Sequence, residues 1–293
     1  MSIHYAPAFA AGLFFSRTER KQKMNSSKSK KSKKWLVIIL AILVVIGAIF
    51  GVVALNAKKN TKVMDDTVES GMKTLSEYAT VTPVDPGEYK NIKLNGMMNF
   101  DVSQYDVENI GNLSVMKVNM GFMQMASYVI TPYEKNLPLL SMDFMYIMGK
   151  RKSYVEFYDL VENTSSEDYV QTMDLLHEFE DKYSSFEEIP SESAWYDKYL
   201  TIAMHKSAKN TDDKEIEQMF CDAVSYYMDS ADKLEILDEA EKQEKLDLTR
   251  EYSQGLVTNG GVSTDVFKKN LGEEKTQDFF DKVFFGTDRA SAT

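Results

Sequence analysis

The chain has 293 residues, of which 43% are hydrophobic and 27% charged. This is the composition of a globular protein, which excludes a wholly disordered, collagenous or coiled-coil chain. One cysteine, Cys221, excludes an intramolecular disulfide and a cysteine-rich metal cluster, and with only three histidines we expect no metal site. Residues 1–34 hold nine Lys and Arg against one Glu, whereas residues 56–293 hold 25 against 44 Asp and Glu. Because this main body carries a net charge of −19, nucleic-acid phosphates would be repelled, which excludes a nucleic-acid binder.

An apolar segment without charges runs from residue 35 to residue 55. As a helix it would be roughly 31 Å long, about the thickness of the hydrocarbon core of a bilayer. A cleaved signal peptide has a shorter apolar core, so the segment predicts an uncleaved transmembrane helix in a lipid bilayer. Five lysines closely precede the segment and three follow it. The positive-inside rule then predicts a single-pass membrane protein with a cytoplasmic N-terminus and an extracytoplasmic main domain.

The remaining boundaries follow from a helical pattern and a break. Met64, Val68, Met72 and Leu75 recur at spacings of three and four, which is typical of an amphipathic helix. The sequence TPVDPG at residues 82–87 then ends that helix. We therefore expect a basic cytoplasmic segment (1–34), a transmembrane helix (35–55), a helical stalk and linker (56–88), a main domain (89–287) and a tail (288–293).

Four segments rich in Tyr, Phe, Val, Ile and Met alternate between apolar and polar residues, as β-strands do. The connections between them are short, which suits antiparallel hairpins and excludes parallel crossovers. Helical patterns follow these segments. The expected strands are 113–120, 122–131, 139–148 and 153–160, and the expected helices are 165–184, 193–208, 212–231, 232–256 and two within 262–285. This order predicts an α+β fold with helices packed on an antiparallel sheet.

Asp143 stands out because it lies within an apolar and aromatic strand. A carboxyl group shielded by apolar walls keeps its proton to a higher pH, as a general acid requires. The alternative is that Asp143 points to the solvent from a half-exposed strand. His205 falls within the expected helix 193–208 and is interpreted as a residue on the helix surface.

Two blocks of sequence resemble a known family. The first, at residues 128–159, contains YVITP, LPLLSMDFMYIMGKR and YVEFYDL. The second, at residues 250–286, contains Tyr252, Asn259 and the pair Gly272-Glu273 ahead of an aromatic end. Together they resemble the ferredoxin-dependent bilin reductases. The resemblance implies a three-layer α/β/α sandwich with a central antiparallel sheet, preceded here by the transmembrane helix. It also implies an open-chain tetrapyrrole between the sheet and the C-terminal helices.

The resemblance implies roles for several residues. Asp143 matches the proton-donating aspartate of the family's central strand. Asp222 and Asp229 are the candidates for a second carboxylate on a helix, and Asp222 is favoured. Ser127 falls where many members have His or Asn, although serine does not titrate near neutral pH. Met125 and Met142, which belong to a cluster of methionines, are expected to bind the substrate together with Ser127. Ordinary core packing is the alternative for the methionines. Such enzymes bind no metal or organic cofactor and receive single electrons from ferredoxin.

Two functions remain open at this point. The first is a membrane-anchored bilin-reductase-like protein, an oxidoreductase that reduces a biliverdin-like tetrapyrrole by proton-coupled electron transfer. The alternative is a surface-anchored module that binds a tetrapyrrole or a protein without catalysis. The acidic main body and the serine at position 127 favour this second function, because ferredoxins are acidic and dock on basic surfaces.

Overall fold

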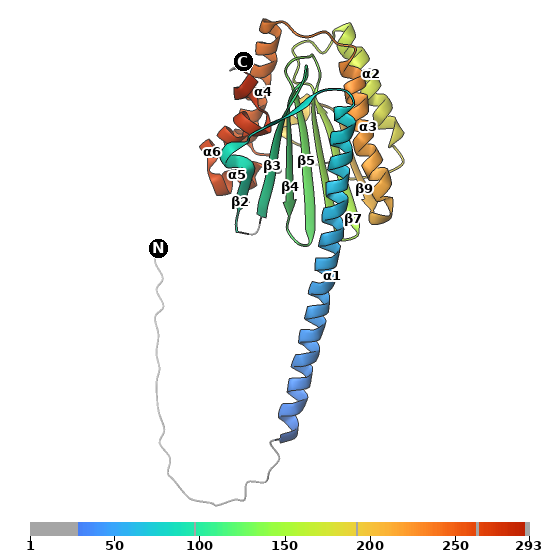
Figure 1. The fold of residues 1–293 in the computed structure, drawn as a ribbon, viewed down its shortest axis with the longest axis vertical. Coiled ribbons are helices and arrows are strands. Elements are labelled where there is room, and N and C mark those ends of the chain that lie inside the picture. The colour runs from blue at the N-terminus through green and yellow to red at the C-terminus, as the bar shows by residue number, and fades with distance from the viewer. Residues whose placement is uncertain (1–28, 97, 192, 262–263, 291–293) are drawn as a thin grey trace, which may run out of the picture. The chain divides into compact units, whose positions relative to one another are not determined.

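The computed structural model describes residues 29–290 apart from residues 97, 192, 262 and 263, with the side chains described from residue 45 onward. The chain divides into two units, residues 1–48 and 49–293. The second unit holds one large sheet with helices on both of its faces (Figure 1). The expected basic segment 1–34 lies almost wholly outside the described residues.

Nine strands of the described residues form this sheet, and every pairing is antiparallel. The order is β1-β3-β4-β5-β6-β7-β9-β8, with β2 also paired to β3. The four expected strands are confirmed as β4 to β7, whereas β1 to β3, β8 and β9 were not among the expected strands. The strands are β1 (Val81–Val84), β2 (Asn91–Leu94), β3 (Met98–Val107), β4 (Gly111–Asn119), β5 (Met123–Pro132), β6 (Leu139–Ile147), β7 (Lys150–Tyr158), β8 (Glu187–Glu188) and β9 (Leu200–Lys209).

One face of the sheet is covered by three helices. They are α1 (Ser29–Ser76), whose second half carries the expected stripe, α2 (Glu167–Lys182) and α3 (Asp213–Ala231). Their apolar side chains form one core with the residues of β6 that point to this face, among them Met142 and Phe144. The core is closed tightly, because Leu75, Met142, Phe179 and Ala223 are all fully buried.

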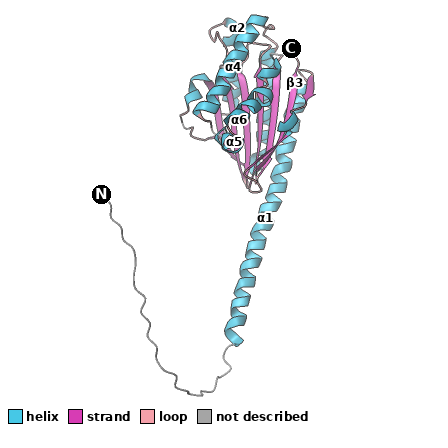
Figure 2. Cartoon of the chain, turned by 90° about the vertical axis from the view of Figure 1, so that its left-hand side faces the viewer, coloured by secondary structure: helices cyan, strands magenta, loops and turns pink. Residues whose placement is uncertain are grey.

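The opposite face carries the C-terminal helices. They are α4 (Glu239–Asn259), α5 (Thr264–Leu271), α6 (Glu273–Phe279) and α7 (Thr287–Ala290), with a π-helical turn at Phe280–Phe284. Asp238 caps α4 by accepting hydrogen bonds from the amides of Ala240 and Glu241. A second core of aromatic and aliphatic side chains lies between these helices and β2 to β4. The sheet is therefore the middle layer of an α+β fold, as Figure 2 shows.

The expected transmembrane helix is wrong. Of the residues that the structure describes, no helix is long and apolar enough to cross a membrane. The apolar segment is instead part of α1, which continues without a break through Lys58, Lys59 and Lys62 to Ser76. The side chains of residues 35–44 lie outside the described part. The predictions of a single-pass topology and of an extracytoplasmic main domain depended on this helix, so they are not supported either.

The expected helix at residues 193–208 is also wrong. This segment consists of a short 3-10 turn, Trp195–Tyr199, followed by β9. β9 pairs with β7 along its length. Ile202 and Met204 of β9 point into the core between the sheet and helices α1, α2 and α3. The segment forms a strand because it pairs with β7, more than forty residues earlier in the chain. Local helix propensity contains no information about such a distant partner.

The contact between α1 and α3 gives a first prediction. A Cβ atom at Gly71 would lie 2.0 Å from Cε1 of Phe220, whereas a Cβ at Gly51 of the same helix meets nothing within 4 Å. We expect Gly71→Ala to lower the free energy of unfolding by about 1–3 kcal/mol, because the two helices must move apart. Gly51→Ala is the matched control and should leave stability unchanged or raise it by up to about 1 kcal/mol. Urea unfolding measures both, and equal effects would contradict the packing.

Candidate functional site

Four side chains form a row across the sheet on the face that carries the C-terminal helices. Ser127 of β5 lies opposite Asp143 of β6, which lies opposite Tyr154 of β7. Tyr154 in turn lies opposite His205 of β9, and their rings meet edge to face with centroids 5.0 Å apart. Because neighbours on a strand point to opposite faces, Asp143 points away from the core that holds Met142 and Phe144.

Asp143 is a half-buried acid with one direct partner. The Ser127 hydroxyl donates a hydrogen bond to Oδ1 of Asp143. Removal from water raises the pKa of Asp143 to about 6, the bond from Ser127 opposes this rise, and the charge of Glu156 adds to it. The group therefore exchanges its proton close to neutral pH, as a general acid must.

A second titratable pair lies beside this row. Nε2 of His205 is 2.7 Å from Oε1 of Glu156, and the Tyr158 hydroxyl donates to Oε2 of Glu156, also at 2.7 Å. The side chains of His205 and Glu156 are only 12% and 16% exposed. Glu156 was not among the candidate residues, and His205 was expected on a helix. The alternation Tyr154, Glu156, Tyr158 within an expected strand was a signal that all three share the face of Asp143.

Aromatic residues cover one end of the site. Tyr252 of α4 packs on Tyr158 at a centroid distance of 5.2 Å. Trp195 and Tyr196 of the 3-10 turn also pack against Tyr252, at centroid distances of 6.0 and 6.5 Å. The indole nitrogen of Trp195 donates to the carbonyl oxygen of Gly260 at 2.7 Å, which fixes the turn to the C-terminal end of α4. This aromatic cover shields the Glu156 end of the row from water.

The other end of the site is lined by methionines and is partly open. Met125 and Met145 lie opposite each other next to the Ser127 and Asp143 pair, and Met123 lies one position further out. All three are only half-buried, whereas the residues behind them on the other face are buried. The structure therefore offers a flexible apolar surface directly beside the acid.

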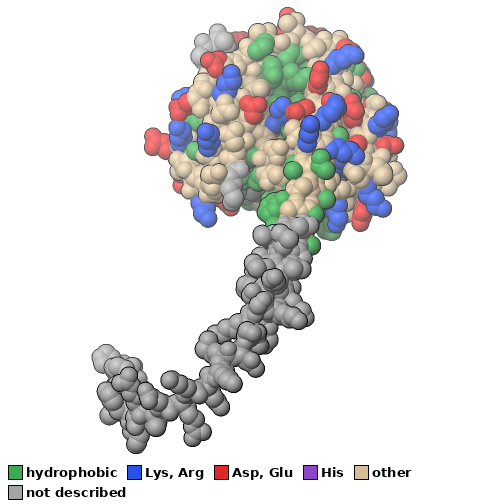
Figure 3. Space-filling model, turned by 60° about the horizontal axis from the view of Figure 1, so that its bottom comes forward, with side chains coloured by type: hydrophobic (Ala, Val, Ile, Leu, Met, Phe, Trp, Pro, Cys, Tyr) green, Lys and Arg blue, Asp and Glu red, His purple; other side chains and the backbone are tan. Residues whose placement is uncertain are grey.

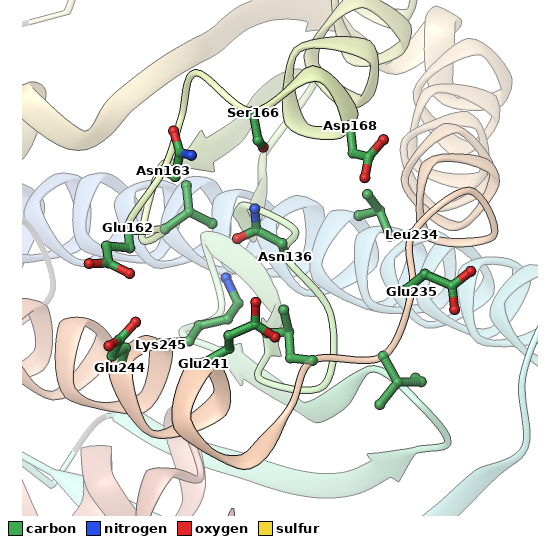
Figure 4. Close-up of a pocket in the computed structure, with 13 residues that line it drawn as sticks. Asn136, Glu162, Asn163, Ser166, Asp168, Leu234, Glu235, Glu241, Glu244 and Lys245 are labelled. Carbon is green, nitrogen blue, oxygen red and sulfur yellow. The ribbon is translucent and has the colours of Figure 1, made fainter.

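Two cavities lie outside this row. One of about 290 Å³ lies between the start of α2 and the start of α4, with Lys245, Glu162 and Glu241 in its lining (Figure 4). The other, of about 320 Å³, lies near Tyr89 and Lys282. Asp143 lines neither of them, so the candidate site is a partly covered face of the sheet.

The structure brings together three of the five residues that the sequence singled out. Ser127, Asp143 and Met125 share one face, while Met142 is buried in the core on the other. Asp222 lies on α3, also behind the sheet, where it pairs with Lys182 and accepts hydrogen bonds from Tyr183 and Gln218. These bonds lower the pKa of Asp222 against the opposing effect of its burial, so it stays ionised at neutral pH. Within the described residues no group of His, Cys, Asp and Glu is arranged to hold a metal ion.

Comparison with known proteins identifies a family and a fold. A sequence model of the family described as ferredoxin-dependent bilin reductase matches residues 77–286. Among solved structures, phytochromobilin synthase from tomato in complex with biliverdin matches with a TM-score of 0.63 and 14% sequence identity, covering 76% of this chain and 83% of that chain. Identity this low shows a shared fold. No curated protein matches the sequence.

The pKa of Asp143 gives a prediction about stability. Its pKa rises from 3.8 in the unfolded chain to about 6 in the fold, so the stability that its proton contributes is complete below pH 4 and lost as pH rises through 6. The asparagine of the Asp143→Asn variant cannot titrate. Between pH 4 and pH 7.5 we therefore expect the free energy of unfolding of the variant to fall less than that of the wild type, with a difference of up to about 3 kcal/mol. Urea unfolding across this range measures the difference.

Ser127→Ala is the companion variant. It removes the hydrogen bond that lowers the pKa of Asp143, so the loss of stability should move to higher pH. Identical pH dependence in the wild type and in both variants would contradict a shielded acid at position 143.

Proposed function

The chain belongs to the ferredoxin-dependent bilin reductase family, and we propose that it reduces a linear tetrapyrrole such as biliverdin by proton-coupled electron transfer. The observation that carries this proposal is Asp143, an acid whose pKa is raised to about 6 on a half-open apolar face. The solved relative phytochromobilin synthase is in complex with biliverdin, which supports the choice of ligand class.

The reaction requires two electrons and two protons for each double bond reduced. Reduced ferredoxin supplies the electrons one at a time, and each ferredoxin is oxidised by one electron. Asp143 donates a proton to the tetrapyrrole and becomes a carboxylate, which Ser127 stabilises through its hydroxyl hydrogen bond. The second proton follows the second electron, after Asp143 has been protonated again. Both hydrogens end on the product.

The face around Asp143 suits a flat, conjugated and largely apolar ligand. Met125 and Met145 supply polarizable side chains that adapt to such a surface. Tyr154 extends this surface toward β9 and is half-buried. The Tyr252 and Trp195 cover limits the ligand on the other side. Exclusion of water between these two layers would keep Asp143 protonated until an electron arrives.

An acidic electron donor needs a basic surface, although the main body carries a net negative charge. Lys150 at the start of β7 lies opposite Lys209 at the end of β9, and both are exposed. Lys152 lies two residues further along β7, opposite Met145. Figure 3 shows Lys and Arg side chains at this end of the domain beside apolar ones, with Asp and Glu side chains interspersed among them. We place the docking site for ferredoxin there, because local charge steers association more than net charge does.

The alternative function is binding of a tetrapyrrole without reduction. Ser127 favours it, because a hydroxyl group does not exchange protons near neutral pH. It predicts a saturable change in the biliverdin spectrum with no turnover when reduced ferredoxin is added.

Titration of the full chain with biliverdin, followed by reduction with reduced ferredoxin, tests the proposal. We expect a saturable shift in visible absorbance on binding, and a further shift on reduction because the conjugated system changes. Asp143→Asn should lower turnover at least 100-fold and leave the dissociation constant for biliverdin within about threefold, because the amide keeps the shape of the acid. Asp222→Asn, behind the sheet, is the comparison carboxylate and should retain turnover. Binding without turnover in the wild type would select the alternative function, and turnover by Asp143→Asn would exclude the role of Asp143.

Charge reversal tests the docking site. We expect Lys150→Glu combined with Lys209→Glu to raise the KM for ferredoxin at least tenfold, with a weaker salt dependence and unchanged biliverdin binding. Lys233→Glu, exposed just beyond the end of α3, is the matched control. If both proteins respond equally to salt, ferredoxin docks elsewhere.

A further inference from the structure

Asp143 is one of three titratable groups on adjacent strands of the same face. Glu156 of β7 is the diagonal neighbour of Asp143, because Asp143 pairs with Tyr154 two residues earlier. Such diagonal neighbours lie about 7 Å apart, within reach of long side chains. His205 of β9 continues the line through its 2.7 Å contact with Glu156. The charge of Glu156 acts on Asp143, so the two carboxyl groups are electrostatically coupled.

The pair of Glu156 and His205 is not required to hold the sheet together. Burial of an ionisable pair costs desolvation, and an apolar pair of similar size is often as stable or more so. The other face of β7 and β9 uses such residues, with Val155 opposite Met204 in the core. A carboxylate and an imidazole at the equivalent place therefore point to chemistry.

Water reaches the pair from the β9 side. Ala203 lies opposite Glu156 and is exposed, as is Thr201 before it. The small side chain of Ala203 leaves an edge of this pair near solvent, and the His205 and Glu156 side chains keep 12% and 16% of their surface exposed. The three groups thus follow one another across this face in the order His205, Glu156, Asp143.

We propose that His205 and Glu156 are a proton-resupply pair that reprotonates Asp143 between the two electron transfers. This role rests on the proposed reductase function and assigns a path for its second proton. After Asp143 has given its proton to the tetrapyrrole, the imidazolium of His205 gives a proton to Glu156, and Glu156 passes one to the Asp143 carboxylate. The neutral imidazole then takes a proton from water. Each cycle moves one proton inward, with no change in the redox state of the protein.

Ser127 on the other side of Asp143 donates a hydrogen bond to the acid and takes no part in the relay. The phenols that face the pair keep their protons across the working range, because burial raises the pKa of each one. They are Tyr154, Tyr158, Tyr196 and Tyr252. Lys152 and Glu187 are the charged side chains next along this face, on β7 and β8.

The pH profile of biliverdin reduction by reduced ferredoxin tests the proposal in the full chain. We expect His205→Ala to lower kcat at least tenfold at pH 8 and much less at pH 5.5, with KM for biliverdin within about twofold, because hydronium replaces the imidazole at low pH. Added imidazole should restore at least half of the lost rate. Ser207→Ala, the next residue of β9 on this face, is the control and should follow the wild type. A loss that is equal at every pH and not rescued by imidazole would overturn the relay.

A second measurement needs no turnover. The carboxyl carbon shift of Asp143, followed by NMR against pH, should show a lower pKa in Glu156→Gln, because the neighbouring negative charge is gone. An unchanged titration of Asp143 would overturn the coupling that the relay requires. If the wild type reduces no biliverdin, the proposed function and the relay role both fail. If the wild type reduces biliverdin and His205→Ala has the same pH profile as the wild type, only the relay role fails.

Discussion

The register of the antiparallel sheet is the constraint on which the site depends. Leu140, Met142 and Phe144 of β6 enter the tightly packed core, so the residues between them must point to the opposite face. A slip of one residue would put Asp143 into that core and the large apolar side chains on the open face. The hydrophobic pattern therefore holds the acid on the half-open face, and the neighbouring strands bring Ser127, Tyr154 and His205 to its side.

Two aspartates with different surroundings show how the fold assigns their protonation. Asp222 lies beside Lys182 and accepts three hydrogen bonds, which favour the charged form. Asp143 has little water around it and a nearby carboxylate in Glu156, which favour the protonated form and outweigh its single hydrogen bond from Ser127. An aspartate is therefore an ionised structural residue on the face covered by α1 to α3, and a proton donor on the face that carries the C-terminal helices. Chemistry on this fold follows from which face a residue occupies.

The two corrected segments have a common cause. The apolar segment at residues 35–55 was interpreted from its own length and lack of charge, and residues 193–208 from their own helical pattern. In the structure the first belongs to a helix that extends to Ser76 and packs by its later residues, such as Met64 and Leu75. The second is ordered by hydrogen bonds to β7. The common cause is that each interpretation used only the residues of the segment itself.

Local pattern was sufficient for much of the molecule. Alternation predicted β4 to β7 and their antiparallel order, and a polar residue in an apolar strand pointed to Asp143, because both signals lie within a few neighbouring residues. The pairing of β7 with β9 joins residues about fifty positions apart, and no local pattern contains that register. Only the tertiary structure could therefore place His205 against Glu156 and Asp222 behind the sheet. Proximity across strands is a property of the register and the packing, whereas the tendency to form each strand is a property of the sequence itself.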